Sequence, residues 1–322
     1  MSWHDEDSTG ASLLSPGPLK PGDKIALISP ASVVKEEYVF GAMERIREFG
    51  YEPLLMPHAI GHSDGSFAAS KVSRLSDLID ALDNPEIKAI LCTRGGYGCS
   101  QLLANFSYGK IHKSKKWIIG FSDVSALLAM WYRSDLTSIH GPMAKHLAMR
   151  PKDDPSTSAL FRILETGGQF NYTVSPHKYN QEGYASGILR GGNLAVLNDL
   201  AGTPYDILDI SGDENVILFL EDINEPIYAV NRMLWRLNLS GALTMVKGII
   251  FGQFTDYKPD KNFETMEDMI HHMMEYSAVI PPFIPIAFNF PTGHTDLNYP
   301  LVEGANVELE VTDLSVRLRT IP

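Results

Sequence analysis

The stretch WIIGFSDVSALLAMWY, residues 117–132, decides how the first half of the chain is expected to fold. Residues 117–120 are apolar and typical of a short buried strand, and residues 124–132 are typical of a helix. Ser122 lies between them on a predicted strand-to-helix turn. Such a turn projects a hydroxyl above a sheet, beside the backbone N–H groups of the helix start. The second glycine of the G-x-S-x-G pattern is missing, so the alternative that Ser122 only caps the helix stays open.

Strand-like and helix-like segments alternate around this stretch. Strands are predicted at residues 24–29, 51–56 and 87–93, and helices at residues 36–49, 70–82 and 101–106. Such alternation is typical of a mostly parallel sheet with helices on both faces. We therefore expect a flavodoxin-like or Rossmann-like α/β domain at residues 21–146. Its ligand site should lie outside the carboxyl ends of the strands.

The rest of the chain differs in composition. Residues 1–20 are rich in Ser, Gly and Pro and are expected to form a flexible arm, and the polar residues 147–185 resemble a linker with one short helix. Residues 186–322 are expected to form a smaller, mixed α/β domain. Its predicted strands are 187–190, 216–220, 248–252, 307–311 and 315–318, the last two as an antiparallel pair, and its predicted helices are 228–237 and 263–276. The cleft between the two domains is the expected binding site.

Charge and composition narrow the class of protein. The 322 residues carry a formal net charge of −12, which argues against nucleic acid or an anionic membrane surface as a partner. The short basic run at residues 110–116 is interpreted as a solvated loop. Cys92 and Cys99 are too few for a disulfide framework or a four-ligand zinc site, and buried thiols are expected. The sequence has neither a membrane-length apolar run nor a typical secretion signal at residues 1–10, so a cytoplasmic location is expected.

Glycines follow the predicted strand at residues 87–93. The segment Arg94-Gly95-Gly96-Tyr97-Gly98 allows positive φ angles and a close approach of the backbone to a ligand. It is interpreted as a second source of N–H donors for an oxyanion, as a phosphate cradle or as a plain tight turn. The phosphate-binding pattern G-x-x-x-x-G-K-[ST] and the dinucleotide-binding pattern G-x-G-x-x-G are both absent from the sequence.

Two further segments carry groups suited to acid–base chemistry. Glu221 follows the apolar strand VILFL, where its carboxylate would be held at the ligand side of the sheet. The alternative is a purely structural role, because acidic residues also stabilise the first turn of a helix and one is predicted to follow. His294 lies in the loop FPTGHTD, residues 290–296, where a histidine can also be merely exposed. Other histidines compete for the role of a base, namely His140, His146, His271 and His272.

Taken together, these segments resemble the LD-carboxypeptidase family, which includes murein tetrapeptide carboxypeptidases and microcin-C immunity peptidases. The resemblance extends over residues 24–305 in the family's order. Its pieces are LISPAS at 27–32, RGGYG at 94–98, GFSD at 120–123, HGPM at 140–143, LRGGNLAVL at 189–197, LFLED at 218–222, YAVNRML at 228–234, GIIFGQF at 248–254 and Gly293-His294.

The resemblance implies a catalytic triad. It places a serine nucleophile at Ser122, a glutamate at Glu221 and a histidine at His294. The family's oxyanion donors correspond to the backbone N–H groups of Gly96 and Asp123. The family uses no metal and no cofactor.

The resemblance also implies a substrate. It predicts a serine carboxypeptidase that cleaves an LD-amide bond and releases terminal D-alanine from murein peptides in cell-wall recycling, as a homodimer. Arg94 and Gly95 are candidates for substrate binding. Arg94 is the candidate for the terminal carboxylate, because a guanidinium binds carboxylates through two hydrogen bonds. A structural salt bridge across the cleft is the alternative role for Arg94. An immunity peptidase that cleaves an aminoacyl-nucleotide, with Tyr172, Tyr179 or Tyr184 stacked on adenine, and a non-catalytic two-lobed binding protein stay open as alternatives.

Overall fold

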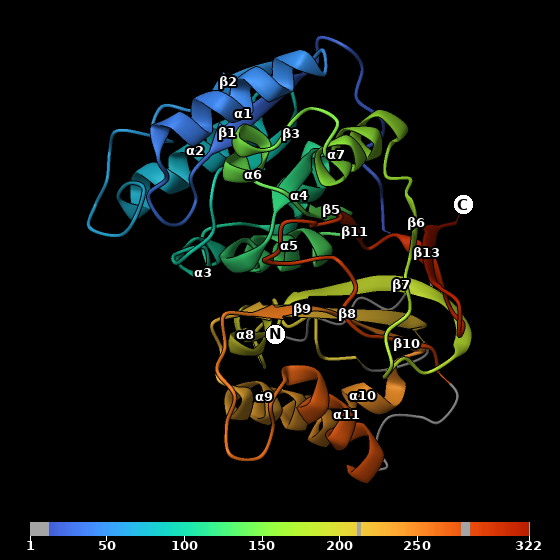
Figure 1. The fold of residues 1–322 in the computed structure, drawn as a ribbon. Helices are drawn as coiled ribbons and strands as arrows, with labels where there is room; N and C mark the ends of the chain where they lie inside the picture. The colour runs from blue at the N-terminus through green and yellow to red at the C-terminus, as the bar shows by residue number, and fades with distance from the viewer. Residues whose placement is uncertain (1–12, 211–213, 278–283, 322) are drawn as a thin grey trace.

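The computed structural model describes residues 13–210, 214–277 and 284–321, and it contains two β-sheets with helices around them (Figure 1). Residues 1–12 of the expected arm lie outside these ranges. The first sheet has the strand order β11-β5-β4-β3-β1-β2. Its strands are β1 (Lys24–Ile28), β2 (Glu52–Leu55), β3 (Ile87–Cys92), β4 (Trp117–Gly120), β5 (Ser138–His140) and β11 (Leu301–Glu303). All neighbouring pairs are parallel except β5 with β11, so the expected parallel sheet is confirmed.

Helices cover both faces of the first sheet. Helices α1 (Glu36–Glu48), α6 (Ala144–Met149) and α7 (Pro155–Thr166) pack on one face, and α2 (Lys71–Asp83), α3 (Ser100–Leu103), α4 (Tyr108–Ser114) and α5 (Ser125–Tyr132) pack on the other. Their apolar spacing explains this packing. In α1, for example, Val39, Ala42 and Ile46 recur on one side of the helix and are buried.

The second sheet mixes parallel and antiparallel pairs. Its order is β10-β9-β8-β7-β12-β13-β6, and β7 to β10 are parallel while the other pairs are antiparallel. Its strands are β6 (Asn171–Val174), β7 (Gly183–Asn193), β8 (Val216–Ile223), β9 (Gly248–Thr255), β10 (Ile286–Ala287), β12 (Asn306–Val311) and β13 (Val316–Thr320). Its helices are α8 (Leu194–Asp199), α9 (Ile227–Leu239), α10 (Ala242–Met245) and α11 (Met266–Ser277). The predicted antiparallel pair near the end of the chain, β12 with β13, is confirmed.

Helix α5 joins the two halves of the molecule. All eight of its residues are buried, and it lies between the two sheets, in contact with α8 (Figure 1). A helix that is apolar on every side requires protein on every side. The turn that precedes α5 is therefore held at the boundary between the two sheets.

The segment at residues 110–116 corrects one expectation. It is not a solvated loop, because α4 extends to Ser114 and Lys116 is buried. The Lys116 ammonium donates hydrogen bonds to the carbonyls of Ala81, Leu82 and Asn84, at 2.7, 2.8 and 2.5 Å. These carbonyls end α2, where a cation satisfies free acceptors. Burial lowers the pKa of Lys116 to about 8.

Two smaller expectations concern the cysteines and the membrane. Cys92 and Cys99 are buried free thiols, as expected. Across the described ranges, no helix combines the length and the apolar character that a membrane crossing requires.

Candidate active site

Ser122 lies at the carboxyl end of β4, on a single helical turn that leads into α5. Its φ angle is +64°, in the left-handed region that residues other than glycine rarely adopt. Neither this turn nor α5 begins with a side-chain cap, so the structure does not use the Ser122 hydroxyl as an N-cap. A strained strand-to-helix turn of this kind presents a hydroxyl outside the end of a sheet.

The glycine loop after β3 lies directly against Ser122. A Cβ at Gly95 would lie 2.9 Å from Ser122 Cβ and 3.1 Å from both Ser122 Oγ and the Asp123 nitrogen, so this close approach requires glycine. Gly96 has a φ angle of +102°, and a Cβ there would lie 2.5 Å from Ser32 Oγ. Within the described ranges, no acceptor takes the Gly96 N–H. The loop therefore brings peptide groups close to the Ser122 hydroxyl.

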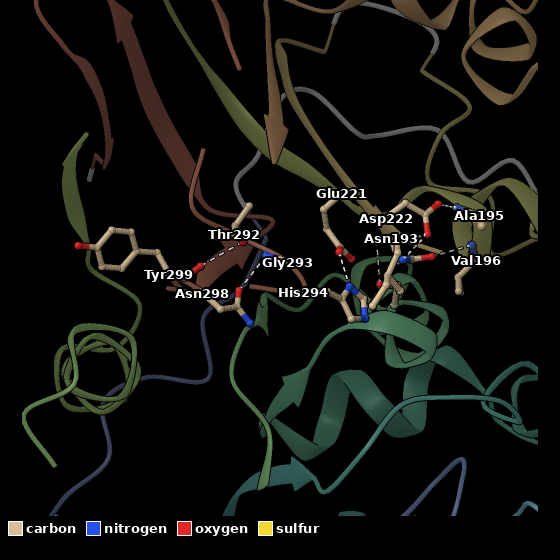
Figure 2. A network of polar contacts seen from close by, with 12 residues as sticks. Asn193, Ala195, Val196, Glu221, Asp222, Thr292, Gly293, His294, Asn298 and Tyr299 are labelled. Carbon is tan, nitrogen blue, oxygen red and sulfur yellow. Dashed lines mark hydrogen bonds and ion pairs between the residues drawn. The ribbon is translucent and has the colours of Figure 1, made fainter. Parts of the chain in front are cut away.

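Glu221 and His294 form a buried pair. Glu221 lies inside β8 and is fully buried, and His294 Nδ1 is 2.8 Å from Glu221 Oε2 (Figure 2). With the Nδ1 proton donated to the carboxylate, Nε2 is the free ring nitrogen. His294 lines the same cleft as Ser122. The structure shows no hydrogen bond between these two described side chains, and such catalytic contacts are often long before substrate binds.

The loop that carries His294 is fixed by a second set of contacts. The Gly293 N–H donates to Asn298 Oδ1 at 2.9 Å, and the Thr292 hydroxyl donates to the carbonyl of Tyr299 at 3.1 Å (Figure 2). The Asn298 N–H in turn donates to Ser156 Oγ at 2.9 Å. The loop is thereby connected to α7, and the position of the imidazole is determined by more than its bond to Glu221.

Asn193 and Asp222 are functional candidates that residue-by-residue reasoning missed. The Asn193 amide donates to Asp222 Oδ1 at 2.9 Å, and the Ala195 N–H donates to Asp222 Oδ2 at 2.8 Å (Figure 2). The Asn193 N–H donates to Ser125 Oγ at 3.1 Å, which connects the two halves of the molecule beside Ser122. Their place in the segments LRGGN and LFLED was the available signal.

The pKa values of the pair shift in opposite directions. Burial alone raises the pKa of Glu221, but the charge and hydrogen bond of His294, together with His140 and Asn193, hold this pKa below its usual value. Burial alone lowers the pKa of His294, but the charge and hydrogen bond of Glu221, together with the charges of Asp222 and Asp256, raise this pKa above 6.5. Burial raises the pKa of Asp222 to about 7, helped by the charge of Glu221.

The competing histidines lie in other environments. His140 is fully buried between the rings of Phe121 and Phe219, and burial lowers its pKa to about 4. His146 also lines the cleft, but it contacts Asp154, which caps α7. His271 and His272 lie on α11, away from the cleft.

Ser122 and His294 open onto a cleft of about 1030 Å³. Arg94, Gly95 and Gly96 line it together with Ser122 and His294. Arg94 Nη1 donates to the carbonyl of Val33 at 2.5 Å, and within the described ranges Arg94 forms no salt bridge across the cleft. Tyr172, Tyr179 and Tyr184 do not line the cleft. In the described part of the chain, no three His, Cys, Asp or Glu side chains are grouped as metal ligands.

Comparisons with known proteins agree on one family. Residues 25–141 match the family model of the LD-carboxypeptidase N-terminal domain, and residues 186–309 match that of the C-terminal domain. The chain is 32% identical to the murein tetrapeptide carboxypeptidase of Pseudomonas aeruginosa over 89% of this chain and 93% of that protein. It is 28% identical to the microcin C7 self-immunity protein MccF of Escherichia coli over 94% of both chains. The crystal structure of muramoyltetrapeptide carboxypeptidase from Oxalobacter formigenes matches with a TM-score of 0.81 and 27% identity, over 93% of this chain and 99% of that one.

Proposed function

The chain belongs to the LD-carboxypeptidase family, a family of peptidases, and we propose that it acts as a serine peptidase with Ser122, His294 and Glu221 as its catalytic triad. The observation that carries this proposal is the contact of 2.8 Å between His294 Nδ1 and the buried Glu221, in the cleft that Ser122 lines. A carboxylate on Nδ1 selects the tautomer whose Nε2 accepts a proton. The left-handed backbone of Ser122 supports its role as nucleophile.

The proposed reaction follows from these positions. His294 Nε2 removes the Ser122 proton while Ser122 Oγ attacks the carbonyl carbon of a terminal amide. The oxyanion that forms accepts hydrogen bonds from the N–H groups of Gly96 and Asp123. The C–N bond then breaks, and His294 gives its proton to the leaving amine. Water, activated by His294, hydrolyses the acyl-enzyme and restores the Ser122 hydroxyl.

The proposed substrate is a small murein peptide with a terminal D-amino acid, and D-alanine is the residue released in cell-wall recycling. The named relatives support this substrate class. Arg94 supports it as well, because its guanidinium lines the cleft beside Gly95 and, within the described ranges, no carboxylate pairs with it. By family resemblance we propose a homodimer, which light scattering of the purified protein tests.

One experiment separates this function from its alternatives. The protein is incubated with murein tetrapeptide and, separately, with an aminoacyl-nucleotide, and products are identified by mass spectrometry. Loss of one D-alanine from the tetrapeptide, absent with Ser122→Ala, supports the proposal. Cleavage of the aminoacyl-nucleotide alone would assign an immunity-type peptidase instead. Binding of either compound without turnover would favour a binding protein.

A further inference from the structure

The cleft is basic, although the chain as a whole is acidic. Its Lys and Arg residues are at positions 35, 94, 145 and 150, and Asp296 is the one carboxylate among its described lining residues. The full chain has a formal net charge of −12. A concave site with charge of one sign raises the local concentration of ligands of the opposite sign. The cleft is therefore suited to an anionic ligand.

The order of the strands places two of these cations on opposite sides of the proposed nucleophile. Arg94 follows β3, Ser122 follows β4, and Lys145 lies in the first turn of α6, which comes after β5. These three strands are neighbours and run parallel, so their carboxyl ends open on the same side of the sheet. Neighbouring strands are about 4.8 Å apart, so β3 and β5 are separated by about 10 Å, the length of three extended residues.

Lys145 differs from the other cations of the cleft in lacking a partner. Its side chain is exposed, and within the described ranges it makes no hydrogen bond or ion pair. The other three are engaged, Lys35 with Glu37, Arg150 with Asp296, and Arg94 with the carbonyl of Val33. An ammonium without a protein partner, in a cleft beside a nucleophile, is available to a ligand.

We propose that Lys145 is a specificity-determining residue that binds a carboxylate in the acyl part of the substrate, on the side of Ser122 opposite Arg94. This inference rests on the proposed function, in which Arg94 binds the terminal carboxylate. A peptide anchored there crosses Ser122 toward β5, and its inner residues reach Lys145. The preferred substrate class is therefore a peptide with a free carboxylate two or three residues before its terminal one.

The test uses two tetrapeptides that both end in free D-alanine. The inner carboxylates are free in one peptide and amidated in the other. Wild-type protein is expected to prefer the peptide with free inner carboxylates by roughly 3- to 10-fold in kcat/KM, mainly through a lower KM. The preference is modest because an exposed ion pair contributes little to the free energy of binding. Lys145→Ala should abolish this preference and Lys145→Glu should reverse it. Raising the salt concentration should weaken the wild-type preference.

A matched control separates local from general charge effects. Lys71, at the start of α2, is exposed and does not line the cleft, so Lys71→Ala should keep the wild-type preference. Equal kcat/KM for both peptides in the wild type, or an unchanged preference in Lys145→Ala, would overturn the inference.

The role of Lys145 can also be judged apart from turnover. If the wild type cleaves neither peptide, the proposed function is rejected, and calorimetric binding of both peptides to Ser122→Ala decides on Lys145. The inference would be supported if Ser122→Ala binds the peptide with free inner carboxylates more tightly than the amidated one, and if the double variant with Lys145→Ala does not. Equal binding of both peptides would overturn it.

Discussion

Gly293 lies so close to Glu221 that a Cβ on Gly293 would be 2.7 Å from the carboxylate oxygen Oε2. This is the same oxygen that contacts His294 Nδ1. The φ angle of Gly293 is +112°, which side chains other than glycine rarely adopt. Both the space and the backbone conformation at this position thus depend on glycine, and the placement of His294 depends on both.

We expect Gly293→Ala to lower kcat/KM by at least ~100-fold, because a shift of about 1 Å in a catalytic group has an effect of that order. It should also lower the free energy of unfolding by about 1–3 kcal/mol through backbone strain. Gly22→Ala is the control, since Gly22 has a φ angle of +88° with no heavy atom within 4 Å of its added Cβ. The control should lose stability and keep activity, as measured by urea unfolding and peptide turnover.

The triad itself gives a second prediction. Ser122→Ala and His294→Ala should each lower kcat by about 1,000-fold or more, and the double variant should be no more than a few-fold worse, because triad members act as a unit. The thermal unfolding midpoint should change little, which separates chemistry from folding. Near-wild-type turnover in Ser122→Ala would refute the serine mechanism.

Sequence patterns predicted the part of the site whose determinants are local. The strand, the turn at Ser122 and the following helix follow from apolar spacing within residues 117–132. Glu221 was expected just after its strand and instead lies inside β8, because β8 continues to Ile223. The family resemblance, rather than any local pattern, singled out His294 among the histidines.

Other features depend on contacts between distant residues. Strand β11 has three residues, too few for a recognisable pattern, and it pairs with β5 more than 150 positions earlier in the chain. The left-handed angle of Ser122 and the close approach of the glycine loop after β3 to Ser122 likewise become visible only in the folded chain. The sequence could not show that the Lys145 ammonium lacks a partner in the cleft, because its neighbours there come from distant parts of the chain.

The pH dependence gives a third prediction. The proposed base is neutral His294, and Glu221 raises the pKa of His294 above its usual 6.5. Because the protonated form is inactive, kcat/KM should fall as pH decreases, with a midpoint above 6.5. Glu221→Gln removes the negative charge while keeping the volume, so in its residual activity this midpoint should move to lower pH. An acid limb that stays in place would point to another base.

The last prediction concerns the terminal carboxylate, because it separates a carboxypeptidase from a general serine hydrolase. Arg94 is an exposed cation beside Gly95, and its contact with Val33 leaves donors of the guanidinium for a ligand. Amidating the terminal D-alanine should therefore lower kcat/KM by about 100-fold, equivalent to about 3 kcal/mol. A peptide that ends in L-alanine should be a similarly poor substrate, because the methyl group and the carboxylate of its last residue exchange places.

Arg94→Ala should bring the free-acid peptide and the amidated peptide to similar, low rates. Arg94→Lys should keep part of the preference for the free acid, because it keeps the charge. The measurement is release of the terminal residue from the three peptides in competition. Comparable rates for all three in the wild type would exclude terminal recognition even if the triad variants are inactive. A preference for the acid that survives Arg94→Ala would assign the carboxylate to another cation of the cleft.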